Sequence, residues 1–288
     1  MKKGFLLSAF LLSIVFAQSQ TTYYWVGGPT PVSIHTTSNW NTVLNGSGSS
    51  RPSATGGTDI LIFDGSNIGG GTPATGLVSG PVDGGITCAQ LKFQNGANVR
   101  FGRTSGTGTI TLNGDGSTAE DFVIESGCNF AISSNTGSVR IALTTTAVPA
   151  PANTGRVSGN MSTVTGFQAR IDNGVAAANF TNGSLRFTSG STMTTNITAG
   201  SSSYSFGNST QSTERWVVFE AGSDLYYDGG FSPMGSGNLF SAMEMKPGST
   251  WHHRATNATS GFGNFFNRKG FANIIVENNA NLVAEGPI

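Results

Sequence analysis

The stretch VVFEAGSDL, residues 217–225, recurs with small changes at five other places in the chain. Each copy has apolar first and third residues, a glycine or asparagine in sixth place, a small residue in seventh and an apolar residue in ninth. The other copies are LKFQNGANV (91–99), FVIESGCNF (122–130), LRFTSGSTM (185–193), MEMKPGSTW (243–251) and IIVENNANL (274–282).

The spacing of these copies indicates a repeat protein. Successive sixth positions are 31, 63, 32, 26 and 31 residues apart. The longest step is close to two periods, which predicts one degenerate copy between Gly127 and Gly190. Repeats of this length are too small to bury their own apolar face, and they stack on their neighbours to build a continuous core.

Within each copy the apolar residues alternate, as in Val217, Phe219, Leu225 and Tyr227. A period of two is typical of strands, because successive side chains point to opposite faces. A glycine or asparagine between two such strands predicts a turn that uses left-handed backbone angles. Asn95-Gly96 would also suit a hairpin, but the long spacing and the asparagine in the last copy favour a corner between two strands of one coil.

We therefore predict an all-β fold, a parallel β-solenoid with coils of roughly 31 residues. The pattern breaks between Ser138 and Asn160, where Pro149 and Pro151 cannot join a central ladder, and we expect a loop that leaves the coil. The third residues of the six copies should form one internal column, made of Phe93, Ile124, Phe187, Phe219, Met245 and Val276.

The first 19 residues have the features of a secretory signal peptide. Lys2 and Lys3 precede an apolar run from Phe5 to Phe16, and small residues follow. Twelve apolar residues are too few to span a bilayer as a helix, which needs about 20. We predict cleavage after Ser19 and a secreted protein that is extracellular or at the cell surface.

Residues 20–85 differ from the repeats, and we expect them to form an atypical N-terminal capping segment. A first coil exposes apolar columns and unpaired strand edges, which a cap must cover. Bulky Trp25, Trp40 and Phe63 suit that role. Residues 86–288 would then be the solenoid repeats. Residues 281–288 show no closing segment, so we expect the chain to continue or to stack on something else.

Composition narrows the class further. Charged residues make up only 10% of the chain, its 15 basic and 15 acidic residues balance, and it contains 41 glycines. Such a surface argues against nucleic-acid binding. A disulfide between Cys88 and Cys128 is one possibility for an exported protein. Alternatively, Cys128 is simply the small residue that follows the turn, as Ser223 is in another copy.

Three motifs near the N-terminus carry a resemblance. YYWVGG from Tyr23, SNWN from Ser38 and DILIFDG from Asp59, followed by strand repeats, resemble the start of large exported β-helix proteins. Autotransporter-like passengers and surface proteins of gliding or gut-type Bacteroidetes are similar, including the glutamine after the cleavage site. The resemblance implies an adhesin, a surface-layer or filament component, or more rarely a polysaccharide-degrading enzyme.

An enzyme on such a scaffold would need clustered carboxylates, often with a basic residue nearby. The best candidates are Glu220, Asp224, Asp228 and Arg215. Glu220 and Asp224 flank the Gly222 turn and should face solvent. Their slots hold ordinary polar residues in the other copies, so these acids are equally well explained as surface residues.

His252 and His253 are adjacent, and adjacent strand residues face opposite sides, so they cannot bind one metal ion without a bend. We expect His253 to be buried for structural reasons, and we predict no metal site and no cofactor. Exposed aromatic residues could stack on sugars. The candidates for such a binding edge are Tyr226, Trp251, Phe265 and Phe266, although the phenylalanines could instead cover a corner.

Taken together, the residues favour a non-enzymatic, exported structural or adhesive protein. It would act by binding or by self-assembly, with other copies of itself or surface glycans as partners, and without nucleic acid or a membrane-spanning segment. The alternatives are a polysaccharide-active lyase or glycoside hydrolase, and a passive glycan-binding module.

Overall fold

The computed structural model describes residues 20–28, 32–66, 78–82, 84–103, 105–114, 119–133, 137–143, 154–164, 169–172, 184–197, 205–206, 215–230, 243–255, 273–277 and 280. The predicted signal peptide, Phe265 and Phe266 lie outside these ranges. The described part of the chain contains 21 strands and one short 3-10 helix, η1 (Thr37–Asn39). The predicted all-β class is confirmed.

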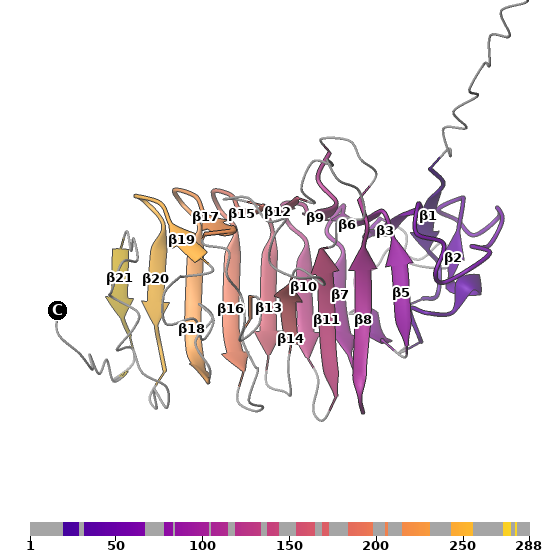
Figure 1. Ribbon diagram of the computed structural model, residues 1–288. Helices are drawn as coiled ribbons and strands as arrows, with labels where there is room; N and C mark the ends of the chain where they lie inside the picture. The colour runs from indigo at the N-terminus through magenta and orange to yellow at the C-terminus, as the bar shows by residue number, and fades with distance from the viewer. Residues whose placement is uncertain are drawn as a thin grey trace, which may run out of the picture.

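The strands form three sheets whose members lie side by side along one direction (Figure 1). Sheet A has nine strands, in the spatial order β19 (Met243–Met245), β17 (Val217–Phe219), β15 (Leu185–Phe187), β12 (Gly155–Val157), β9 (Phe122–Ile124), β6 (Gln90–Gln94), β3 (Ile60–Asp64), β1 (Thr22–Trp25) and β2 (Trp40–Asn41).

Sheet B has eight strands, in the order β21 (Asn273–Val276), β20 (Thr250–His253), β18 (Asp224–Gly230), β16 (Thr192–Ile197), β13 (Asn160–Val164), β10 (Asn129–Ser133), β7 (Asn98–Gly102) and β4 (Val78–Pro81). Sheet C has four, in the order β14 (Ala169–Asp172), β11 (Ser138–Leu143), β8 (Thr107–Leu112) and β5 (Gly85–Cys88).

From β3 to β20 consecutive strands belong to different sheets, and strands about one repeat apart are paired. The chain passes from sheet A to sheet B to sheet C in β6, β7 and β8, and again in β9, β10 and β11. Only β1 and β2 pair in antiparallel fashion among the described strands. Parallel pairing between strands far apart in sequence is compatible with the predicted β-solenoid.

The predicted internal column is confirmed in its first five members and wrong in its sixth. Phe93 pairs with Ile124 in sheet A, and the column continues through Val157, Phe187 and Phe219 to Met245. All of these side chains are buried. Val276 instead lies in β21, opposite His253 in sheet B, and is 48% exposed.

The recurring turn of the repeat joins a strand of sheet A to a strand of sheet B, and its predicted left-handed backbone angles are confirmed. Gly127, Gly190, Gly222 and Gly248 have φ between +79° and +93°, the region that favours glycine. In each turn the backbone N–H of the following residue donates to the carbonyl three residues earlier, for example Ser223 to Glu220 at 3.1 Å. The degenerate copy is GRVSGN, residues 155–160, with a turn two residues shorter.

The expectation of one long loop between Ser138 and Asn160 is wrong. Ser138–Leu143 is β11 of sheet C and Gly155–Val157 is β12 of sheet A, so only residues 144–153, which include both prolines, fall outside the described ranges. Sheet C itself was not predicted. Its inner face carries a column of Ile86, Ile110, Ile141 and Ile171, which a bridge extends to Phe206.

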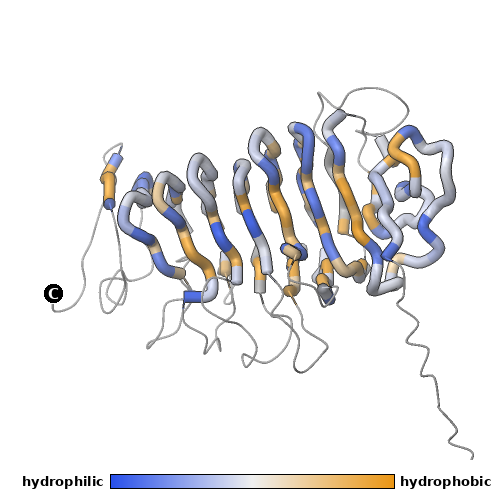
Figure 2. Tube along the Cα trace, turned by 90° about the horizontal axis from the view of Figure 1, so that it is seen from above, coloured by the Kyte–Doolittle hydropathy of each residue, from blue (hydrophilic) through white to orange (hydrophobic). Residues whose placement is uncertain are grey.

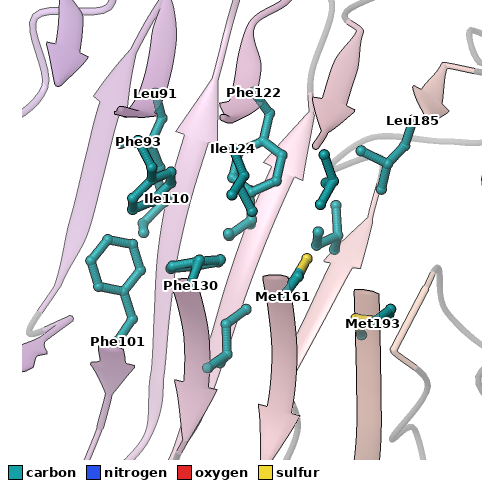
Figure 3. Close-up of a cluster of buried hydrophobic side chains, with 14 of the residues drawn as sticks. Leu91, Phe93, Phe101, Ile110, Phe122, Ile124, Phe130, Met161, Leu185 and Met193 are labelled. Carbon is teal, nitrogen blue, oxygen red and sulfur yellow. The ribbon is translucent and has the colours of Figure 1, made fainter. Parts of the chain in front are cut away.

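The core lies between the three sheets and is rich in stacked aromatic rings. Phe93 and Phe101, from sheets A and B, contact Phe130, with ring centroids 4.6 and 5.0 Å away. Figure 3 shows such side chains converging from different strands. Figure 2 shows apolar and polar residues alternating along the strands, as expected when one face of each strand is buried.

The N-terminal end is closed by aromatic side chains. Trp25, Trp40 and Phe63 lie within 5.3 Å of one another, measured between ring centroids, and are at most 1% exposed. The buried Arg51 side chain contacts Asp59 at 2.9 Å and donates to the carbonyl of Thr87. Regular pairing with the repeats already begins at β3, within the predicted capping segment 20–85.

Cys88 and Cys128 are free and buried. Cys88 lies at the end of β5 in sheet C, whereas Cys128 follows the Gly127 turn, in the small-residue slot. Burial raises the pKa of the Cys88 thiol to about 12 and also raises the pKa of Cys128. Both thiols therefore stay protonated and pack as small buried side chains, and neither has the lowered pKa of a reactive nucleophile.

Candidate functional site

The outer face of sheet B carries the densest group of charged side chains that involves predicted site residues. β18 buries Leu225 and Tyr227, so Asp224, Tyr226 and Asp228 face outward. The next strand places His252 opposite Tyr226. We call the sheet B cluster the set of Asp224, Tyr226, Asp228, His252, Arg254 and Glu277.

His252 is at the centre of the cluster, between two carboxylates. Its Nε2 lies 3.4 Å from Oδ1 of Asp224, and its Nδ1 lies 2.5 Å from Oε1 of Glu277. A neutral imidazole has one N–H and can donate to only one of these groups, whereas an imidazolium ion can donate to both. With its side chain 14% exposed, the ring is reachable from solvent and could transfer a proton.

Tyr226 lies beside His252, and its ring contacts both His252 and Arg254. The two rings stack with centroids 4.3 Å apart, and the guanidinium carbon of Arg254 lies 4.4 Å from the tyrosine centroid. Partial burial raises the pKa of the Tyr226 hydroxyl, and the nearby Asp224 carboxylate acts in the same direction. Nε of Arg254 also donates to Oδ1 of Asp228 at 2.6 Å.

The structure brings together only part of the predicted catalytic set. Asp224 and Asp228 both belong to the sheet B cluster, as does the predicted binding residue Tyr226. Glu220 instead contacts Arg186 of sheet A, with Nη1 and Oε1 2.9 Å apart. Arg215, with φ of 54°, is exposed just before β17. The four predicted residues therefore do not form one acid–base site.

Trp251 is not part of a binding edge, so that prediction is wrong. It occupies the inward column of sheet B, paired with Leu225, and is 1% exposed. Its ring lies 5.6 Å from that of Tyr227, between centroids. The register follows from the turn, because Trp251 and Leu225 are both three residues after their glycine. His253 is buried, as expected.

Sequence reasoning missed the partners that surround Tyr226. His252 could have been placed beside it, because each residue follows its turn glycine by four positions. The same alignment places Arg254 beside Asp228, because each follows its turn glycine by six positions. Glu277 could not, because the repeat places its strand in sheet A, whereas β21 lies in sheet B.

Beyond this cluster, the outer face of sheet B is polar and mostly uncharged. Asn129, Asn160 and Thr192 occupy one outward column. Their side chains are joined by hydrogen bonds of 2.9 and 2.8 Å. Such side-chain hydrogen bonds stabilise adjacent strands, and the same outward column continues to Asp224.

The three carboxylates of the sheet B cluster share two basic side chains, so the cluster keeps a net negative charge. Asp224 and Glu277 contact His252, and Asp228 contacts Arg254. Across the described ranges, no group of three or more His, Cys, Asp or Glu side chains is arranged to hold a metal ion. The cluster can offer polar groups to a ligand, and the His252 imidazole is one that can either donate or accept a hydrogen bond.

Comparison with known proteins does not assign the chain to a family. No protein-family model matches it, and searches of curated proteins and of solved structures find no significant match. In the described part of the chain, no helix has the length and apolar character needed to cross a membrane.

Proposed function

We propose that this chain is an exported parallel β-solenoid that serves as a structural or adhesive component of a cell surface or extracellular matrix. In this proposal the three sheets are the walls of one coil, and the first 19 residues direct export. The resemblance of its N-terminal motifs to exported β-helix proteins supports the same reading.

The observation that carries the proposal is the pair of long parallel ladders. Sheets A and B contain nine and eight strands, and their inward columns form one continuous core. A regular wall of this kind suits binding to an extended partner or lateral and end-to-end assembly. Catalysis is less well supported, because the acids of the sheet B cluster are each held by a basic side chain.

Self-assembly can be tested with purified residues 20–288. Sedimentation velocity and negative-stain electron microscopy at several protein concentrations should reveal ordered fibres, sheets or defined oligomers. Monomers at every concentration, together with no adhesion to cells or matrix, would contradict the proposal. N-terminal sequencing of protein secreted from a bacterial host should give Gln20 as the first residue.

A glycan-binding or polysaccharide-active protein is the second candidate. It is favoured by the sheet B cluster, which combines an aromatic ring, a histidine and an arginine on one exposed face. Binding to a glycan array that is lost in Tyr226→Ala but kept in Thr194→Ala, the preceding residue of the same outward column, would support binding. Release of sugar fragments that depends on His252 would support catalysis instead.

A further inference from the structure

The three carboxylates of the sheet B cluster have acceptor oxygens that remain available to a ligand. His252 contacts Oδ1 of Asp224 at 3.4 Å and Oε1 of Glu277 at 2.5 Å. Arg254 donates to Oδ1 of Asp228. Within the described ranges, no donor contacts the second oxygen of any of these three carboxylates, and their side chains are 30–35% exposed. The surface therefore offers acceptors, and a ligand rich in N–H or O–H donors fits it.

The charge of the cluster restricts the class of ligand further. Three carboxylates stand against one guanidinium and one imidazole, so the net charge stays negative even when His252 is protonated. The neighbouring strand β16 adds no charge, because its outward residues are Thr192, Thr194 and Asn196. A negative patch repels sulfated or carboxylated ligands and attracts a cation.

A β-bulge sets the position of Asp228 in the cluster. The pairing of β18 with β16 passes from Tyr227 to Gly229 without it, and the other parallel pairings of the described strands have no such shift. Gly229 and Gly230 have φ of 144° and 81°, and a Cβ atom on Gly230 would clash with the carbonyl oxygen of Ile197. Bulges are common next to functional sites, where they re-aim a side chain. The one irregular pairing thus coincides with the sheet B cluster.

The groups beside the carboxylates favour a cationic saccharide over a basic peptide. Tyr226 supplies an aromatic ring, and Thr194 and Ser162 precede it in the same outward column. Aromatic rings pack against the apolar face of a sugar, and side-chain hydroxyls both donate to and accept from sugar hydroxyls. A lysine side chain would instead bury its aliphatic stem on apolar surface, whereas this column continues into two hydroxyl residues.

We propose that the sheet B cluster binds an amino sugar, with the protonated amino group beside Asp224 and the sugar hydroxyls along Thr192 and Thr194. Asp224 is the most exposed of the three acids, and its contact with His252 is the longest in the cluster. An ammonium group brings three N–H donors and a positive charge to its free oxygen. The inference rests on the second candidate function, glycan binding, and names the chemical class of the glycan.

Two oligosaccharides that differ only at the amino group test this assignment. The hexasaccharides of glucosamine and of N-acetylglucosamine share one backbone, and acetylation removes the positive charge. Isothermal titration calorimetry with residues 20–288 at pH 6, where the amino groups are protonated, measures both affinities. We expect the glucosamine oligomer to bind about tenfold more tightly, as one hydrogen bond between charged groups contributes. The difference should shrink as the salt concentration is raised.

Three variants separate the charge from the aromatic ring. Asp224→Asn keeps the shape of the side chain, and it should lower the affinity for the glucosamine oligomer about tenfold without changing that for the acetylated one. Tyr226→Ala should weaken the binding of both oligomers alike. Glu220→Gln is the matched control and should change neither affinity, because this acid flanks the same turn but contacts Arg186 outside the cluster. Circular dichroism and urea denaturation check that each variant is folded.

Three results would overturn the inference. Equal or tighter binding of the acetylated oligomer would show a site for neutral glycans. Equal binding of tetralysine, lost in the same way in Asp224→Asn, would show a site for any cation. Binding of neither oligosaccharide would leave the cluster without this ligand. The proposed structural role is measured separately, by sedimentation and electron microscopy of the same protein, so its failure is distinguishable from that of the amino-sugar site.

Discussion

The two ends of the sheets differ in how their last strand is covered. At the N-terminal end, the short antiparallel strand β2 closes sheet A, and Trp25, Trp40 and Phe63 fill the space behind it. At the C-terminal end, β21 has all four residues exposed. Within the described residues, one end is a packed cap and the other is an exposed strand.

This difference shows that closing a stack of parallel strands requires dedicated residues and does not follow from the repeat. Trp40 and Arg51 have no counterparts in the repeat, whereas Phe63 continues the column of Phe93. Because local stability follows buried apolar contact, the N-terminal end should be the stable end and β21 the first strand to open. The following substitutions test that contrast.

The largest effect is expected for Phe63→Ala. Phe63 is fully buried and contacts Trp25, Trp40, Phe93 and Phe101. Removing a buried aromatic ring should lower the free energy of unfolding by about 3–5 kcal/mol. The measurement is urea denaturation followed by tryptophan fluorescence and by circular dichroism.

Val276→Ala is the matched change at the open end. Because Val276 is half exposed, it should alter the free energy of unfolding by no more than about 0.5 kcal/mol. Equal losses at Phe63 and Val276 would contradict the contrast between the ends. A loss of about 2 kcal/mol at Val276 would instead indicate that its side chain is buried in solution.

How much of this contrast could be predicted from the sequence differs between the ends. The aromatic cap was predicted from its bulky residues, and the turns and inward columns were predicted from the repeat. The exposure of Val276 was not, because periodicity assigns a residue to a column but says nothing of whether an opposing strand is present. The pairing of β21 with β20 is determined by tertiary contacts and not by the repeat.

Sheet C and the sheet B cluster were missed for different reasons. The strands of sheet C lie outside the turn motif that identifies the copies, and TGTITL and SVRIAL (107–112 and 138–143) share little sequence beyond their apolar alternation. For the cluster, alternation of side chains along a single strand does not place Tyr226 beside His252. Alignment of the turn glycines would have paired them, whereas Trp251 was misplaced because its inward slot was not counted.

The second effect concerns buried charge. Nε of Arg51 lies 2.9 Å from Asp59, and its other nitrogens donate to the carbonyls of Ala54 and Thr87. Arg51→Met removes these donors and leaves Asp59 largely buried without its cation. Breaking such a pair should lower the free energy of unfolding by about 3 kcal/mol.

Lys246 is the control at the open end. It contacts Glu244 at 2.9 Å, but its side chain is 41% exposed. Exposed ion pairs contribute little, so Lys246→Met should cost less than about 1 kcal/mol. A cost at Lys246 as large as that at Arg51 would show that burial does not set the strength of ion pairs in this protein.

The smallest effect concerns Asp64, at the end of β3, and depends on pH. Burial alone would raise the pKa of its carboxyl group, but hydrogen bonds outweigh that effect and hold the pKa below its ordinary value of 3.8. The donors are the side chains of Ser66, Gln94 and Asn95 and the backbone N–H of Ser66. These bonds tie β3 to the turn of the next repeat.

A group whose pKa is lower in the folded protein stabilises it above the pKa of the unfolded chain, and this contribution is lost as pH falls through the folded value. Asp64→Asn should therefore lower the free energy of unfolding by about 1–2 kcal/mol at pH 7. Its difference from the parent protein should shrink steadily below about pH 4. Urea denaturation at pH 7, 4 and 3 measures this difference.

Gln94→Ala serves as the matched variant, because it removes one donor and leaves the carboxylate in place. NMR titration should show the pKa of Asp64 higher in Gln94→Ala than in the parent protein, and still lower than 3.8. This result would show that a hydrogen bond from the neighbouring repeat lowers the pKa of Asp64 and so contributes to stability at the N-terminal end. A difference between Asp64→Asn and the parent that is constant from pH 7 to 3 would exclude this role, because a neutral acid cannot keep the same advantage over an amide once its charge is gone.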